Sequence, residues 1–148
     1  MTPTGSRGSV LYRRGAWERR HGLERFFWIC LAGAAGTGAR YLIALWAAQR
    51  FGSAFPYGTL IVNLFGCFVI AALMHAALTF GWSPTVRAAV TIGFIGGLTT
   101  YSSFNYETMR LFQESAPAAG VANLAVTMLG GLMAGWLGLV TTREILGR

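Results

Sequence analysis

The chain has 148 residues, of which 54% are hydrophobic and only 11% are charged, and its mean hydropathy is +0.50. A soluble domain carries about 25% charged residues, so these charges are too few to cover a soluble surface. All 12 basic residues are arginine, all 5 acidic residues are glutamate, and the formal net charge is +7. With so apolar a body, the anionic surface of a lipid bilayer is the expected partner of this charge, and no nucleic acid is expected. The composition predicts an integral membrane protein.

The first 25 residues differ in composition from the rest of the chain. They contain six arginines, two glutamates and several glycines, with no sustained apolar period. Such a segment is typical of a disordered basic tail. The sequence therefore predicts a tail over residues 1–25, a membrane domain over 26–142 and a short C-terminal tail over 143–148.

Four apolar segments follow the tail. Each exceeds the roughly 20 helical residues needed to cross a hydrocarbon core of about 30 Å. Short stretches with glycine and proline separate them, which is typical of turns and helix starts. The predicted membrane helices cover residues 26–49, 57–80, 85–112 and 118–141. Because the connections are short, neighbouring helices run antiparallel, and we expect an all-α protein of four transmembrane helices.

The arginines near the ends of these helices indicate how the chain inserts. With the amino terminus inside the cell, Arg87, Arg143 and Arg148 lie on the side of the tail, and Arg50 and Arg110 lie opposite. Without the tail the count is three against two, which gives almost no preference. The body of the chain therefore permits insertion in both orientations, whereas the six arginines of the tail favour an inside amino terminus.

The third apolar segment is a poor membrane helix. Gly96 and Gly97 are adjacent, and hydroxyl residues fill every position from Thr99 to Ser103. Each glycine destabilises a helix by about 1 kcal/mol relative to alanine. Irregular backbone inside a membrane is tolerated only where it is buried in protein or faces a hydrated cavity. We therefore expect the third helix to be broken, with freed carbonyls that suit a small hard cation and freed amides that suit an anion.

Polar residues inside the predicted spans fall at helical spacing, and such residues often mark function. The stripes are Gly33, Gly36, Thr37 and Arg40; Thr59, Asn63 and Gly66; Thr100, Ser103 and Glu107, with Tyr101 and Phe104 beside them; and Asn123, Thr127 and Gly131. The small residues of the first stripe would let another helix approach closely. Arg40 is either a snorkelling residue, part of a buried ion pair, or a vestibule charge that attracts anions. Asn63 either makes an interhelical hydrogen bond or offers its side-chain amide as a hydrogen-bond donor deep in the membrane.

Three motifs follow one another in the first three spans: GTGARY over residues 36–41, GTLIVNLFG over 58–66 and GFIGGLTTYSSF over 93–104. By these motifs the chain resembles the CrcB/Fluc fluoride channels from about residue 33 to residue 141. The resemblance implies small four-helix subunits that pair as antiparallel, dual-topology dimers in the cell inner membrane. It implies passive conduction of fluoride out of the cell, which protects the cell from fluoride toxicity. The partner would be a second copy of the chain or an oppositely oriented paralogue.

The resemblance also implies roles for individual residues. Gly96 and Thr99 would give backbone carbonyls to a structural sodium ion (Na+) at the dimer centre. Arg40 would belong to the vestibule, and Glu107 to a network at the pore entrance or helix end. The residues of the fluoride pathway would be Asn63, Tyr101, Ser103, Phe104, Asn123 and Thr127. Two positions depart from the family pattern, which usually has phenylalanine in place of Tyr101 and serine or threonine in place of Gly131.

Three other classes of protein compete with a channel. A purely structural scaffold would explain the glycine stripes but not a hydroxyl-rich, broken third helix. A small proton-coupled multidrug-type exporter also uses four short helices, but it needs a titratable carboxylate at depth, and Glu107 is the only candidate within the spans. An enzyme is not expected. The chain has no aspartate, His21 and His75 are isolated, and neither Cys30 nor Cys67 lies beside a histidine in a recognisable pattern.

Overall fold

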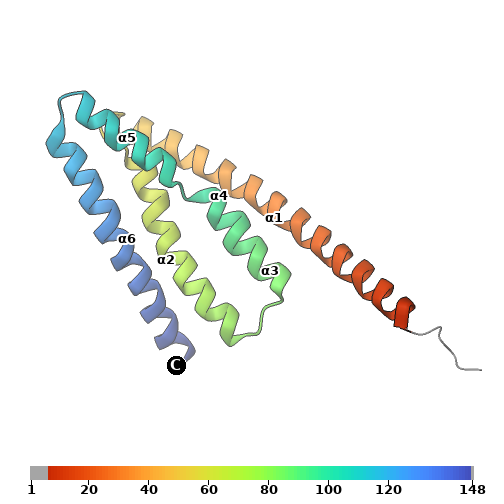
Figure 1. Cartoon of the computed structure of the whole chain (residues 1–148). Helices are drawn as coiled ribbons and strands as arrows, with labels where there is room; N and C mark the ends of the chain where they lie inside the picture. Colours follow the sequence, from red (N-terminus) through yellow and green to blue (C-terminus); the bar gives the residue numbers. More distant parts are fainter. Residues whose placement is uncertain (1–6, 148) are drawn as a thin grey trace, which may run out of the picture.

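The computed structural model describes the backbone of residues 7–147 and the side chains of residues 21–147, and this part of the chain forms helices and short connections without a strand (Figure 1). The elements are α1 (Arg7–Phe51), α2 (Tyr57–Thr79), α3 (Pro84–Ala88), the π-helical segment η1 (Ala89–Ile95), α4 (Gly96–Leu98), α5 (Tyr101–Gln113) and α6 (Pro117–Leu146). The all-helical prediction is confirmed. Helices α2 and α6 contain nearly all of the predicted spans 57–80 and 118–141, and α1 contains the predicted span 26–49.

The connections carry residues that stop or start a helix. Gly52 and Gly81 have φ values of 81° and 63°, a backbone conformation that glycine adopts without steric cost. Pro84 and Pro117 lie in the first turns of α3 and α6, where the missing amide hydrogen is not needed. The side chain of Ser83 caps α3. These local signals explain why the turns fall where the sequence predicts them.

The predicted basic tail falls largely outside the described side chains. Residues 1–6 lie outside the described backbone, and the disorder expected for them stays a prediction. Residues 7–25 are helical and belong to α1, so this helix begins well before the predicted boundary at residue 26. The chain has no proline between Pro3 and Pro56 that would stop a helix there. The division at residues 143–148 also stays a prediction, and α6 continues through most of them.

Three of the described helices are long and apolar enough to cross a membrane, over His21–Phe51, Tyr57–Thr79 and Pro117–Leu146. The segment predicted as another span, 85–112, falls on the shorter elements α3, η1, α4 and α5. Large apolar side chains are exposed on all of the long helices. An apolar surface of this extent is expected on a protein that faces lipid or another subunit rather than water.

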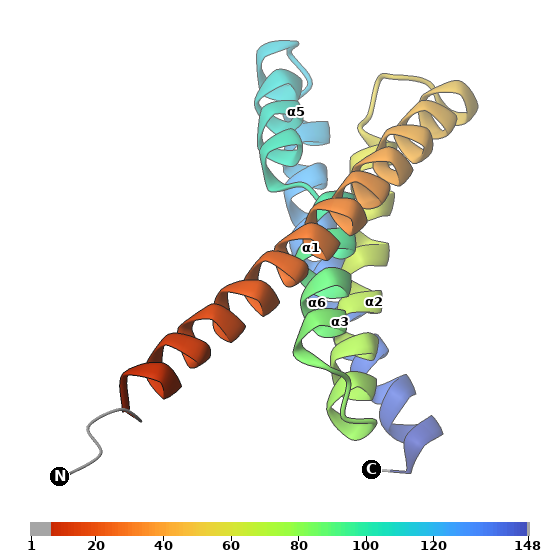
Figure 2. The ribbon, with the colours of Figure 1, turned by 90° about the vertical axis from the view of Figure 1, so that its right-hand side faces the viewer.

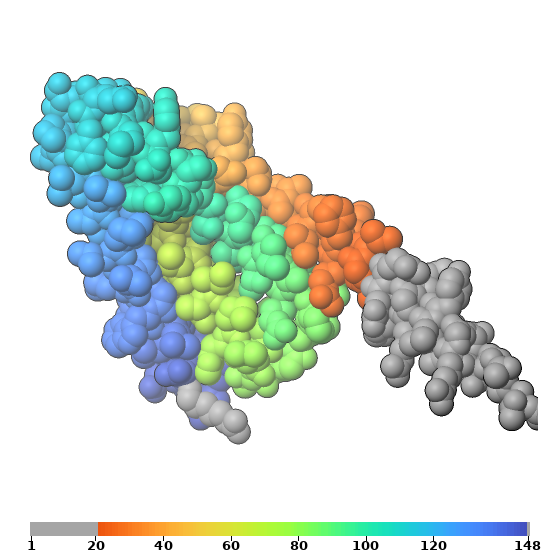
Figure 3. Space-filling view, in the orientation of Figure 1, coloured from red at the N-terminus to blue at the C-terminus, as the bar shows by residue number. Residues whose placement is uncertain are grey.

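The helices pack through close backbone contacts. Helix α2 lies along α6, and α1 crosses the others obliquely and packs on η1 and α4 (Figure 2). A Cβ atom on Gly36 of α1 would overlap the carbonyl oxygen of Phe94, and one on Gly138 of α6 would overlap that of Phe68. The close approach predicted for the glycine stripe of the first span is therefore confirmed. On the face shown in Figure 3, the α3–α4 run lies between α1 and α2.

Candidate functional site

The helical run that begins at Pro84 stops after Leu98, and α5 begins at Tyr101. Between them Thr99 (φ −84°, ψ 155°) and Thr100 (φ −151°, ψ 118°) have extended backbone. The carboxyl end of one helix and the amino end of another therefore meet at these two residues, which we call the interruption. Their carbonyls carry partial negative charge and their amides partial positive charge.

Asn63 of α2 holds the interruption through both of its amide atoms. Its Nδ2 donates to the carbonyl oxygen of Thr100 over 3.0 Å, and the Thr100 backbone amide donates to Asn63 Oδ1 over 2.8 Å. A backbone N–H or C=O group without a partner in an apolar interior costs roughly several kcal/mol. Asn63 therefore supplies partners that the backbone of Thr100 needs. The structure shows the hydrogen-bonded pair, and the second N–H of the Asn63 side chain leaves the donor role open.

Arg40 of α1 reaches the other side of the interruption. Its Nε donates to the carbonyl oxygen of Gly97 over 3.0 Å, which satisfies a carbonyl at the carboxyl end of α4. Arg40 forms no ion pair among the described residues. It lines an open groove of about 280 Å³, which we call the Arg40 groove. This groove is lined by Thr37, Arg40, Thr59, Thr100, Ser103 and Glu107, together with three other residues.

Thr100, Ser103 and Glu107 line one face of α5, as their spacing predicts. Thr100 Oγ1 accepts from the Ser103 backbone amide over 3.2 Å and donates to Ser103 Oγ over 3.0 Å, so Thr100 caps α5. Further along the face, Thr59 of α2 donates its hydroxyl to Glu107 Oε1 over 2.9 Å. Within residues 21–147, the second carboxylate oxygen, Oε2, is buried without a hydrogen-bond partner.

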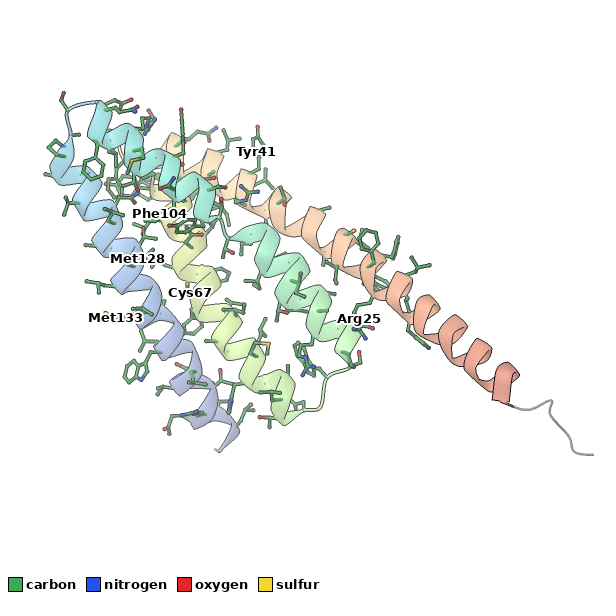
Figure 4. The ribbon with its side chains drawn as sticks, viewed as in Figure 1. Arg25, Tyr41, Cys67, Phe104, Met128 and Met133 are labelled. Carbon is green, nitrogen blue, oxygen red and sulfur yellow. The ribbon has the colours of Figure 1, made fainter. Side chains whose placement is uncertain are left out.

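A second open groove of about 350 Å³ lies on the other side of Thr100. We call it the central groove, and its lining includes Asn63, Cys67, Thr99, Tyr101, Phe104 and Thr127. The Phe104 side chain is 3% exposed, whereas Tyr101 is 74% exposed, and their ring centroids lie 5.8 Å apart. Figure 4 shows Phe104 of α5, Met128 of α6 and Cys67 of α2 close to one another.

Asn123 and Thr127 share one line of α6 but meet different surroundings. Asn123 is 1% exposed and donates its amide to Thr108 Oγ1 over 2.8 Å, and Thr108 donates to the Phe104 carbonyl oxygen over 2.7 Å. Asn123 therefore ties α6 to the backbone of Phe104 and is not among the residues that line the central groove. Thr127 lines that groove, is 7% exposed, and its Oγ1 has no hydrogen-bond partner within the described part of the chain.

Sequence reasoning assigned no role to Thr108 and placed Thr59 on a stripe without a partner. The signal for Thr108 was weak, because a helical threonine often donates its hydroxyl to the carbonyl four residues earlier, whatever its function. Gly96 is exposed, and Gly96 and Thr99 lie at the carboxyl end of the α4 helical run, where backbone carbonyls are freed. No cluster of three or more His, Cys, Asp or Glu side chains occurs among the described residues.

Taken together, the two grooves meet at Thr100 and bring hydroxyl groups, a guanidinium and aromatic rings to one interruption. Hydroxyl and guanidinium groups donate hydrogen bonds, so the arrangement can replace part of the water shell of a small anion.

Comparison with known proteins agrees with this geometry. The profile of a family described as "CrcB-like protein, Camphor Resistance (CrcB)" matches residues 27–139. The chain is 52% identical over 125 residues to the fluoride-specific ion channel FluC of Sorangium cellulosum, covering 84% of this chain and 98% of that protein. It is 40% identical over 124 residues to the protein of the same name from Citrifermentans bemidjiense, covering 83% and 100% of the two chains. The identity to that of Anaeromyxobacter dehalogenans is 44% over 126 residues, covering 84% and 100%. The family resemblance given by the three motifs is confirmed.

Proposed function

This chain belongs to the CrcB family, and from that premise we propose that it is a fluoride-selective, passive ion channel of the cell inner membrane. The chain is a membrane protein and not an enzyme. It exports fluoride from the cytoplasm and so lowers fluoride toxicity. The names of its relatives support fluoride as the ion, since each is called a fluoride-specific ion channel.

The observation that carries this proposal is the interruption at Thr99 and Thr100 between two grooves. We infer that α3, η1, α4 and α5 cross the membrane together as a broken third helix. Fluoride is small and strongly hydrated, so a path must offer donors at close range as water is removed. Hydroxyl groups of Ser103 and Thr127, the amide of Asn63, and the edges of Tyr101 and Phe104 supply such donors or positive ring edges in this proposal.

The two grooves differ in charge, because Arg40 and Glu107 both line the Arg40 groove. The Arg40 guanidinium has five N–H donors, and among the described residues its Nε donates to Gly97. The side chains that line the central groove are neutral. An ion must bind well enough to enter and weakly enough to leave, so a charged vestibule before a neutral passage favours conduction over trapping. Asn123 supports the passage by fixing Phe104 through Thr108, and Glu107 stands at its entrance.

One chain leaves both grooves open at its surface, and a selective path needs walls on every side. Tyr101 is 74% exposed and Leu132 is 73% exposed, so apolar and aromatic groups are available to a second subunit. We propose an antiparallel, dual-topology homodimer with pores at the subunit interface. The three-to-two arginine count of the body supports insertion in both orientations. If the basic tail fixes one orientation, the partner is an oppositely inserted paralogue.

A central structural sodium ion fits the chemistry of the interruption. The carbonyl oxygens of Gly96 and Thr99 are hard ligands at the negative end of a helical run, which suits Na+. Two oxygens from one chain are too few to enclose a hard cation, so the ion would be shared between two copies, which together supply four. When bound, such a cation would neutralise the facing carbonyls and hold the two interruptions together.

The test is fluoride efflux from liposomes that contain the purified full chain, followed with a fluoride electrode. We expect fluoride to leave passively and chloride to stay, with equal initial rates in the presence and absence of a proton gradient. Absence of fluoride flux overturns the proposal. The Glu107→Gln variant distinguishes a channel from a proton-coupled exporter. In an exporter it abolishes proton-coupled exchange, whereas in a channel it leaves passive anion flux at least partly intact.

A further inference from the structure

The line of polar side chains on α6 stops at Gly131. Asn123 and Thr127 precede it at intervals of four residues, and residue 131 has no side chain to continue the line. The neighbouring helix α2 borders this space. A Cβ atom built on Gly131 would lie 3.5 Å from Cys67 Sγ of α2, which is ordinary van der Waals contact. The thiol therefore lies beside the place where a side chain at residue 131 would begin.

The same thiol shares the central groove with an unsatisfied hydroxyl. Cys67, Thr127 and Phe104 all line this groove, and Figure 4 labels Cys67 on α2 and Phe104 on α5. Thr127 is 7% exposed, and its Oγ1 is buried without a partner within the described residues. A buried polar group normally has a hydrogen-bond partner, so this hydroxyl indicates that the groove receives a ligand.

We propose that the Cys67 thiol is a contact of the anion path, and that it takes the place of the side chain missing at residue 131. This inference rests on the proposed fluoride channel. A thiol is a weak hydrogen-bond donor, so it can pass an ion onward from Thr127 without holding it. Cys67 thereby sets the rate of passage through the groove, and the departure at Gly131 is compensated from the opposite helix.

Substitution tests this assignment in the liposome efflux assay. Removing a weak donor in Cys67→Ala should lower fluoride flux about threefold, in line with the modest net value of one hydrogen bond. Cys67→Ser keeps a donor and should retain at least the original flux. The double variant Cys67→Ala/Gly131→Ser moves the donor to α6 and should restore most of the flux, whereas Cys67→Ala/Gly131→Ala, which restores volume without a donor, should not. Cys30→Ala is the matched control, because Cys30 is exposed on α1 and does not line the groove.

Silver ion gives an independent measure, since this soft cation binds thiols. In the Cys30→Ala background, where Cys67 is the remaining cysteine, silver should block fluoride efflux, and added fluoride should slow the block. In the Cys67→Ala background, silver should have no effect. Unchanged flux in Cys67→Ala, together with no silver block in Cys30→Ala, overturns this inference while leaving the channel intact. Absence of fluoride flux in the unmodified chain overturns the proposed function and this inference with it.

Discussion

The paired helices α2 and α6 and the segmented run from α3 to α5 satisfy their backbone hydrogen bonds in opposite ways. Helices α2 and α6 are uninterrupted over Tyr57–Thr79 and Pro117–Leu146, so their backbone groups are satisfied internally. The segmented run changes from α to π geometry and then opens at Thr99 and Thr100. Its backbone depends on side chains from other helices, because Asn63 and Arg40 bond to it.

The contrast teaches where function can be placed in a small membrane protein. Regular helices offer an ion only side chains, whereas an opened helix also exposes backbone amides and carbonyls. The opened backbone is stable only where regular helices hold it, so the site and its support lie on different elements. Substitutions on the two kinds of element should therefore separate loss of support from loss of passage.

The largest effect is expected where support and passage coincide. In Asn63→Leu, the Thr100 amide and carbonyl both lose their partner, at about 1–3 kcal/mol each. We expect the thermal stability in detergent to fall and fluoride flux to drop about 100-fold or more, which corresponds to about 2.7 kcal/mol. Asn105→Leu, at an exposed asparagine of α5, serves as the control and should keep both properties. Normal flux from Asn63→Leu would show that the pair to Thr100 is dispensable.

A smaller effect, confined to passage, is expected at Phe104. Phe104→Ile keeps an apolar side chain at this buried position but removes the aromatic edge that faces the central groove. Flux should fall about tenfold, equivalent to about 1.4 kcal/mol, with the variant still folded by circular dichroism and size-exclusion chromatography. Phe112→Ile, on the same helix but outside the groove, is the matched substitution. Equal flux from the two variants would contradict a role for the Phe104 ring.

A weaker effect is expected at Arg40. Arg40→Lys keeps the positive charge but loses the planar donor group that bonds Gly97, because an ammonium group is not an equivalent replacement. Flux through Arg40→Lys should fall about threefold to fivefold at low ionic strength. This loss should depend less on salt concentration than the loss in Arg40→Gln, which removes the charge. Arg50→Lys, at the exposed end of α1, provides the comparison. If Arg40→Lys and Arg50→Lys behave alike, the bond to Gly97 contributes nothing to passage.

The smallest effect on passage is expected in the regular pair. Gly138→Ala forces a methyl group onto the carbonyl of Phe68, and overpacking of this kind costs about 1–3 kcal/mol. Thermal stability should fall, while flux per folded channel stays within twofold. At Gly135 a Cβ atom would have an ordinary contact of 3.6 Å, so Gly135→Ala should be tolerated. A selective loss of flux in Gly138→Ala would extend the functional region into the α2–α6 pair.

The sequence predicted the helical architecture and the family because both depend on local patterns. Apolar runs bounded by Pro84 and Pro117 place the helices, and the glycine stripe containing Gly36 indicates a close helix contact. The π geometry of η1 was not predicted, because it depends on how the run packs against α1. The extension of α1 before residue 26 was also not predicted. The charged composition of this segment indicates exposure to water, and an exposed segment can still be helical.

The candidate site was predictable as a set of residues but not as a set of partners. Helical spacing predicted that Thr100, Ser103 and Glu107 share one face, and in the structure all three line the Arg40 groove. The hydrogen bond from Asn123 to Thr108 joins two helices, and the residue spacing within either helix cannot predict it. The approach of Cys67 to Gly131 is of the same kind, because it follows from the packing of α2 on α6.

An experimental structure of the full chain in a lipid bilayer, determined in sodium fluoride, tests the central claim most directly. The account predicts two oppositely inserted copies whose Thr99–Thr100 interruptions face a shared seam. It also predicts a cation between the four carbonyls of Gly96 and Thr99, and anion density beside Phe104. A continuous helix through residues 84–113 that faces lipid, with no ion between subunits, would contradict it.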